Sequence, residues 1–205
     1  MNYAGARRAL MRRDPVLAPV IRAGGPCGLA SVPHEDPYTA LVRTIVAQQL
    51  SARAGDTIFG RVLALAGGSG SLDAATVARL DDALLRGAGM SRAKVRFVRD
   101  LAERALDGRL DFHALHGLDD DAAIEALTTV KGVGRWTAEI YLMFKLQRAD
   151  VLPVDDVGLQ RAVQRVYGLR RRPTERQMRR IAEPWRPYRS VACWYLWWSL
   201  DQGQG

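Results

Sequence analysis

Cysteine is scarce in this chain of 205 residues, which contains only Cys27 and Cys193. Two thiols cannot form a four-thiolate iron–sulfur or zinc site, and a chain of this size needs no disulfide for stability. We therefore expect two buried or incidental thiols in a reducing compartment. No segment approaches the ~20 consecutive apolar residues of a membrane-spanning helix, and the basic N-terminal segment lacks the apolar core of a signal peptide. These absences predict an intracellular protein of the cytoplasm, in the bacterial cytosol or nucleoid, with no membrane association.

Acidic residues are outnumbered, since 30 Lys and Arg stand against 22 Asp and Glu and the formal net charge is +8. Such a surplus attracts polyanions, with nucleic acid first and an anionic membrane second. Histidine is also rare. His113 and His116 lie three residues apart and close to Asp111, but no further ligand or cysteine cluster accompanies them. We expect two surface histidines and no metal site.

Apolar residues recur at helical spacing along the chain, and segments with strand-type alternation are few. Asp36-Pro37 begins a helical pattern that continues until Gly67-Gly68, Ser91 begins another that ends at Gly108, and Asp121 begins a third. Thr174 with Gln177 has the spacing of a capping box. Further helices are expected over about 156–167 and 188–200. The sequence predicts an all-α protein of about ten helices.

The most specific local feature is the segment LTTVKGVGRWTAEI, residues 127–140, in which two helices are joined by a turn containing two glycines. Side chains at these positions would keep a phosphate from approaching the backbone. Exposed amides before a new helix, with its positive N-terminal end, form an anion site. This is the pattern of a helix–hairpin–helix motif that binds one DNA phosphate, and a plain helical hairpin is the alternative. The predicted phosphate-binding residues are Lys131, Gly132, Val133, Gly134 and Arg135.

A pair of carboxylates, Asp155 and Asp156, follows Pro153 where the next helix is expected to start. The N-terminus of a helix stabilises negative charge, so at least one of them should be ionised at neutral pH. The alternative is an ordinary helix N-cap, because Asp is common at that position.

The hairpin and the following Pro-Val-Asp-Asp together resemble the superfamily of helix–hairpin–helix DNA glycosylases. Within it the chain is most similar to the 3-methyladenine DNA glycosylase II (alkylbase DNA glycosylase) branch. The resemblance covers about residues 36 to 200. It rests also on the stretches IVAQQLSARA at 45–54, GMSRAKV at 89–95, GRWTA at 134–138 and WRPYRSVACWYLWW at 185–198.

The resemblance implies that Asp156 is the catalytic carboxylate and that Asp155 caps the helix or shapes its loop. In glycosidic bond cleavage such a carboxylate would stabilise the positive charge that develops on the sugar, or activate water. Bifunctional relatives carry a Schiff-base lysine two residues after the second hairpin glycine. Here that position is Trp136, which implies a monofunctional hydrolase of N-glycosyl bonds without lyase activity. Lys131 lies on the wrong side of the turn for this chemistry.

The family also implies a base pocket and a wedge. Trp194, Trp197 and Trp198 share one side of the last helix, and core packing accounts for most of them, whereas Trp197 is expected to line the pocket. Trp136 and Gln48 would join it there, and Gln49 would fill the space left by a flipped base. Aromatic rings suit cationic alkylated bases. The alternative for the two glutamines is a solvent-exposed helix end. Where a second pocket tyrosine can follow the tryptophan, this chain has Ile140.

The family organisation implies two helical lobes with a cleft between them. One lobe would span residues 37–148 and end in the helix–hairpin–helix at about 121–146, and residues 1–36 with 149–205 would form the other and carry the aspartate. We expect no N-terminal sheet domain, no cofactor, a monomer, and double-stranded DNA containing alkylated bases as the partner, with binding that weakens steeply with salt. The other hypotheses are a non-catalytic helix–hairpin–helix DNA-binding protein and a glycosylase for another lesion, such as uracil, oxidised guanine or a mismatched base.

Overall fold

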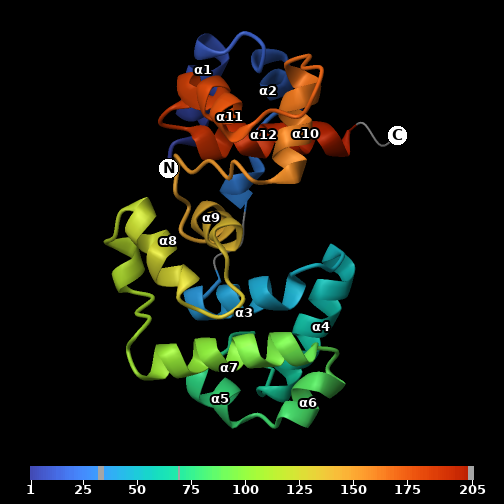
Figure 1. The fold of residues 1–205 in the computed structure, drawn as a ribbon, viewed down its shortest axis with the longest axis vertical. Coiled ribbons are helices and arrows are strands. Elements are labelled where there is room, and N and C mark those ends of the chain that lie inside the picture. Colours follow the sequence, from blue (N-terminus) through green and yellow to red (C-terminus); the bar gives the residue numbers. More distant parts are fainter. Residues whose placement is uncertain (32–34, 69, 203–205) are drawn as a thin grey trace. The chain divides into compact units, whose positions relative to one another are not determined.

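The computed structural model describes residues 1–31, 35–68 and 70–202. These residues form helices and loops with no β-strand among them, so the all-α prediction is confirmed. The described residues contain twelve α-helices and three short 3-10 helices (Figure 1): α1 (Tyr3–Arg13), α2 (Ala18–Gly24), η1 (Gly28–Ser31), α3 (Pro37–Ala47), α4 (Ala52–Leu65), α5 (Ala74–Arg79), α6 (Asp82–Gly87), α7 (Arg92–Leu106), η2 (Ala114–His116), α8 (Asp120–Thr128), α9 (Arg135–Phe144), α10 (Val157–Val166), α11 (Glu175–Ala182), η3 (Glu183–Trp185) and α12 (Arg189–Asp201). Within the described ranges, no helix is both long enough and apolar enough to cross a membrane.

The chain divides into two compact units, one of which is continuous and spans His34–Tyr141. At its centre α7 packs against α3, α5 and α6, and α3 also packs against α4. In Figure 1, α5 and α6 lie on one side of α7 and α3 on the other. The buried apolar side chains of α7 are Val95, Val98, Leu101 and Ala102.

The second unit joins the two ends of the chain, Met1–Pro33 and Leu142–Gly205. Helix α12 forms its core and packs against α1, α2, α10 and η1. Both cysteines are buried in this unit, as expected. Asp14 is buried as well, and its carboxylate accepts hydrogen bonds from Trp185 Nε1 at 2.7 Å and from the Tyr167 hydroxyl at 2.5 Å. These bonds tie α1 to the segments that precede α12.

Local capping chemistry sets most helix starts. Asp36 accepts from Thr39 N at 2.8 Å with Pro37 at the first helical position, and Ser91 caps α7. The capping box predicted at Thr174 and Gln177 is confirmed. Each of these side chains satisfies an amide that the first helical turn leaves unpaired.

Three helical expectations need correction. The helical pattern expected from Pro37 until Gly67 comprises two helices, because α3 ends at Ala47 and Ser51 caps the separate helix α4. Helix α8 begins at Asp120 with Asp119 as its cap, so the predicted start at Asp121 was late. The count of about ten was low, because α1 and α2 were not predicted.

Candidate functional site

The hairpin turn, residues Thr129–Gly134, joins α8 to α9 in the continuous unit. Gly132 adopts φ +79°, a left-handed conformation that side chains disfavour, and a Cβ atom there would lie 2.1 Å from Phe97 Cδ2. Gly134 faces open space, since a Cβ atom there would meet nothing within 4 Å. The first glycine is therefore required by the fold, and the second leaves room for a ligand to approach the backbone.

Two amides of the predicted phosphate-binding set already donate inside the protein. Lys131 N donates to Asp100 Oδ2 at 2.9 Å, and Val133 N donates to the Val130 carbonyl at 3.1 Å. The valine side chain is buried, whereas that of Lys131 is 69 % exposed. What Lys131 offers to a phosphate is therefore its ammonium group.

Both cations of the turn have acidic neighbours. Lys131 Nζ lies 3.4 Å from Asp100 Oδ1, and Arg135 Nε lies 3.0 Å from the buried carboxylate of Glu139. The Arg135 guanidinium also lies 3.5 Å from the exposed Asp121. Only the Arg135–Asp121 pair joins two exposed side chains, and such pairs contribute little. The carboxylates of Asp100 and Glu139 are buried, so an incoming phosphate would compete with them for the exposed ends of both cations.

The Gln48–Ser51 loop links α3 to α4. Gln48 follows the last helical residue and Gln49 has φ 58°, an uncommon conformation outside glycine. Gln48 is half-buried, and its Nε2 donates to the Gly132 carbonyl at 2.9 Å and to Thr137 Oγ1 at 3.4 Å. Gln49 is exposed. The two neighbours thus differ, because Gln48 binds the hairpin turn and Gln49 is exposed.

A pocket of about 750 Å³ lies in this same unit between the loop, the turn and the start of α9. Trp136 is 44 % exposed on its wall, a high value for a large aromatic ring. Ile140 lines the pocket too, one helical turn further along. The full lining is Arg43, Thr44, Ala47, Gln48, Gln49, Leu50, Phe97, Gly132, Trp136, Thr137 and Ile140. The structure therefore brings together four of the predicted site residues, Gln48, Gln49, Gly132 and Trp136.

Asp156 lies in the other unit, at the N-terminus of α10. Its Oδ1 accepts from Leu159 N and from Trp197 Nε1, the latter at 2.9 Å. Asp156 is itself the N-cap of α10. Of the two roles expected for Asp155, capping this helix was therefore wrong, and shaping the loop stays a prediction. Asp155 is exposed, whereas Asp156 is half-buried. The structure thus separates the two neighbouring carboxylates and gives only Asp156 an aromatic partner.

Trp197 is the tryptophan of α12 that contacts the carboxylate. Its half-buried ring stacks on Phe144, with ring centroids 6.1 Å apart and 29° between the planes. The neighbouring Trp194 packs instead against Gly28 and edge-on against Tyr195, and Trp185 is fully buried. Core packing accounts for Trp185 and Trp194, as expected for most of the tryptophans.

Four residues of these sites were missed in the sequence. Lys94, Phe97 and Asp100 of α7 contact the Gln48–Ser51 loop and the hairpin turn, and Phe144 contacts Trp197. A signal was available, because Phe97 is an aromatic residue outside the apolar face of an amphipathic helix. In the described part of the chain, no three His, Cys, Asp or Glu side chains gather as a metal ion would need.

Comparison with known proteins places this geometry among DNA repair proteins. Residues 42–187 match the family described as HhH-GPD superfamily base excision DNA repair protein. The alkylbase DNA glycosidase-like protein mag2 of Schizosaccharomyces pombe is 29 % identical over 96 % of this chain and 93 % of its own length.

Two solved structures are similar throughout. The crystal structure of a DNA-3-methyladenine glycosidase from Bacillus halodurans superposes with a TM-score of 0.82 and 38 % identity, covering 95 % of this chain and 88 % of that one. The 3-methyladenine DNA glycosylase Mag1 of Schizosaccharomyces pombe, in complex with abasic DNA, gives 0.85 and 28 % identity, covering 96 % and 97 %.

Proposed function

Because the chain belongs to the HhH-GPD superfamily of base excision DNA repair proteins, we propose that it is a monofunctional DNA glycosylase. It removes alkylated bases, 3-methyladenine and 7-methylpurines among them, from double-stranded DNA by hydrolysing the N-glycosidic bond. The similar proteins carry names that refer to alkylbase or 3-methyladenine glycosylase activity. The single observation that carries the proposal is the pairing of Asp156 with Trp197, which gives a fixed carboxylate beside an aromatic ring.

Asp156 is the proposed catalytic residue. Departure of the base leaves positive charge on the sugar, and a preorganised carboxylate stabilises that charge without having to reorganise. The bonds from Leu159 N and Trp197 Nε1 fix the orientation of Asp156 Oδ1. The same carboxylate can orient the attacking water or accept its proton. An N3- or N7-alkylated purine is already cationic, so its departure needs little help from a general acid.

Base recognition is assigned to aromatic rings. Trp136 and Trp197 offer faces on which an electron-poor, cationic base can stack, and such attraction strengthens when the cation is desolvated. Gln49, exposed at the loop, is the residue proposed to fill the space of the flipped base. Gln48 lines the pocket, and its side-chain amide donates to the Gly132 carbonyl of the hairpin turn.

We propose that the protein has no lyase activity, because position 136 is a tryptophan. A Schiff base needs an amine, and the residue two positions after Gly134 is a tryptophan. Borohydride reduction during the reaction should therefore trap no covalent protein–DNA adduct, and the product strand should stay uncut until alkali is added. A trapped adduct would contradict this part of the proposal.

The decisive experiment measures base release from methylated duplex DNA by chromatography of the freed bases. The variants are Asp156→Asn and, as a matched control, Asp155→Asn, which removes the same charge from the exposed neighbour. We expect release by the wild type and by the control, and loss of release by Asp156→Asn with retained binding to abasic-site DNA. Binding without release by the wild type, over several lesion types, would favour a non-catalytic DNA-binding protein. Release of uracil or oxidised guanine in preference to alkylated bases would favour a glycosylase for another lesion.

A further inference from the structure

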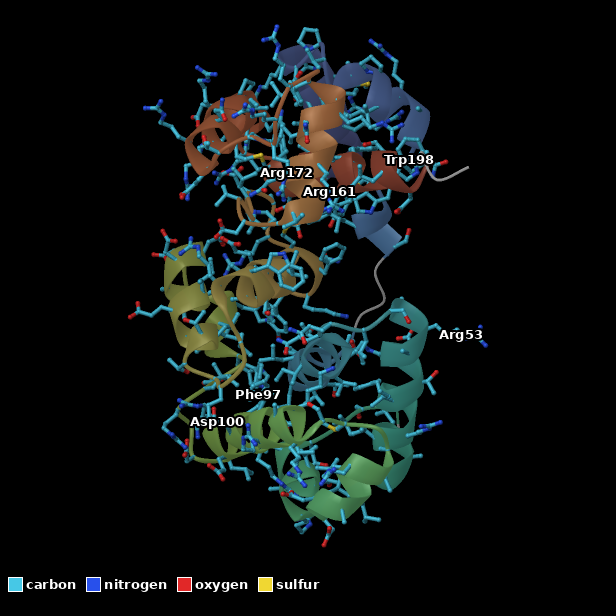
Figure 2. The ribbon with its side chains drawn as sticks, turned by 45° about the vertical axis from the view of Figure 1, so that its right-hand side comes forward. Arg53, Phe97, Asp100, Arg161, Arg172 and Trp198 are labelled. Carbon is cyan, nitrogen blue, oxygen red and sulfur yellow. The ribbon has the colours of Figure 1, made fainter. Side chains whose placement is uncertain are left out.

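Helix α7 presents one row of side chains to both the Gln48–Ser51 loop and the hairpin turn. Lys94, Phe97 and Asp100 are spaced three residues apart and therefore lie along one side of the helix. Figure 2 labels Phe97 and Asp100 on this helix. The three residues are a cation, an aromatic ring and an anion, and each meets a different part of the backbone.

Lys94 holds the loop. Its Nζ donates to the Val46 carbonyl at 2.6 Å and to the Gln48 carbonyl at 2.7 Å. These carbonyls stand at the C-terminus of α3, where the helix leaves acceptors unpaired and where a cation is favoured. Partial burial lowers the pKa of Lys94 below its ordinary value. The lysine therefore fixes the backbone immediately before Gln49.

Phe97 and Asp100 hold the hairpin turn. The backbone of Gly132 lies directly against the Phe97 ring, so closely that a Cβ atom would not fit. Asp100 is 6 % exposed, and its Oδ2 accepts from Lys131 N at 2.9 Å and from Arg104 Nε at 2.8 Å. The Phe97 ring thus packs against the turn at Gly132, and the Asp100 carboxylate binds the turn at the Lys131 amide.

Gln48 connects the Gln48–Ser51 loop to the hairpin turn. Its main-chain carbonyl receives the Lys94 ammonium, and its side-chain amide donates to the Gly132 carbonyl. The loop and the turn are therefore linked to each other as well as to α7. Residues of both segments, together with Phe97, line the same pocket.

From these contacts we propose that Lys94, Phe97 and Asp100 are positioning residues. They set the distance between Gln49, the proposed wedge, and the phosphate-binding hairpin turn. The inference rests on the proposed function and assigns different roles in it to different residues of α7. Lys94 serves base flipping through the loop, and Asp100 serves phosphate binding through the turn. Constellations of this kind lose activity when their members shift by about 1 Å, at a cost on the order of 100-fold in rate.

The test for Lys94 uses one alkylated base in two contexts, fully paired and opposite an abasic site, where no partner base has to be separated. Lys94→Met keeps the length of the side chain and removes its ammonium. We expect single-turnover release from the paired lesion to slow by about 100-fold and release from the unpaired lesion to change far less. Lys94→Arg, which keeps charge and donors, should recover much of the paired rate. Arg96→Met, on the exposed side of the same helix, is the control and should behave like the wild type.

The test for Asp100 measures affinity for abasic-site DNA. Asp100→Asn should weaken binding in both lesion contexts alike and leave the single-turnover rate at saturating enzyme unchanged. Asp107→Asn, at the exposed end of α7, is its control. Equal slowing of paired and unpaired lesions by Lys94→Met, or a change confined to the melting temperature, would overturn the proposal. Failure of the proposed function would look different, because then the wild type itself would release no base.

Discussion

The two glycines of the hairpin turn are expected to respond to the same substitution in opposite ways. Gly132→Ala forces a side chain into a left-handed conformation, which costs about 1–2 kcal/mol. It also places Cβ 2.1 Å from Phe97 Cδ2, and overpacking of this kind costs about 1–3 kcal/mol. A combined loss of about 3 kcal/mol corresponds to a fall of roughly 6–12 °C in melting temperature for a protein of this size.

Gly134→Ala should leave the fold almost unchanged. Its backbone is not left-handed, and its Cβ would meet no atom within 4 Å, so a change below about 0.5 kcal/mol is expected. The new methyl group would instead occupy the space through which a phosphate reaches the backbone amides. Loss of one hydrogen bond to a charged group costs about 1.5–3 kcal/mol, or roughly tenfold to a hundredfold in affinity.

The assay pairs denaturant unfolding with fluorescence anisotropy on abasic-site DNA for both variants. A double-mutant cycle with Phe97→Ala isolates the steric part, because the alanine removes the ring against which the new Cβ collides. In that background Gly132→Ala should cost less by about 1–3 kcal/mol. The reasoning would be refuted by a Gly132→Ala protein as stable as the wild type, or by a Gly134→Ala protein that binds DNA with unchanged affinity.

Three further predictions concern stability. Asp14→Ala should cost about 3 kcal/mol in chemical unfolding, because the buried Trp185 indole and the half-buried Tyr167 hydroxyl lose their acceptor; a loss below about 1 kcal/mol would show that these bonds matter little. Thr174→Ala removes the capping box of α11 and should cost about 1 kcal/mol, whereas an unchanged midpoint would contradict the capping argument. Burial tends to raise the pKa of Asp100, but the Lys131 amide and Arg104 outweigh it and hold that pKa below its ordinary value. Its contribution is therefore present above pH ~4 and is lost as the pH falls through the folded-state pKa. The stability difference between wild type and Asp100→Asn should shrink from pH 7 to pH 3, and a constant difference would contradict the assignment.

Short-range patterns in the sequence were sufficient for the fold class and for many helix starts. A cap and the amide it satisfies lie three residues apart, as Asp36 and Thr39 or Thr174 and Gln177 do, so the pairing is visible without any tertiary information. The glycine pair of the hairpin is equally local. The family resemblance added the aspartate, the tryptophans and the glutamines as candidates, because it spans nearly the whole chain.

The sequence-based predictions were wrong where two neighbouring residues could fill the same structural role equally well. Asp155 and Asp156 both precede a helix, and either can cap it by the same chemistry. The indole of Trp197, 41 positions further along the chain, contacts Asp156, and only the packing of α12 against α10 brings it there. The break between α3 and α4 was missed for a similar reason, since the apolar spacing continues across the loop.

Contacts over long sequence separations were decided by the tertiary structure alone. Gln48 meets Gly132 across 84 positions and Lys94 meets Gln48 across 46, and neither pair shares a helix. No propensity or spacing rule acts over such separations, because those rules describe neighbours within one or two helical turns. The sequence by itself thus determined the all-α fold class and many helix starts, and it supplied candidates for the residues that carry chemistry. The packing around α7 decided how the loop and the turn are held, since its Lys94 and Asp100 contact segments that are far away in the sequence.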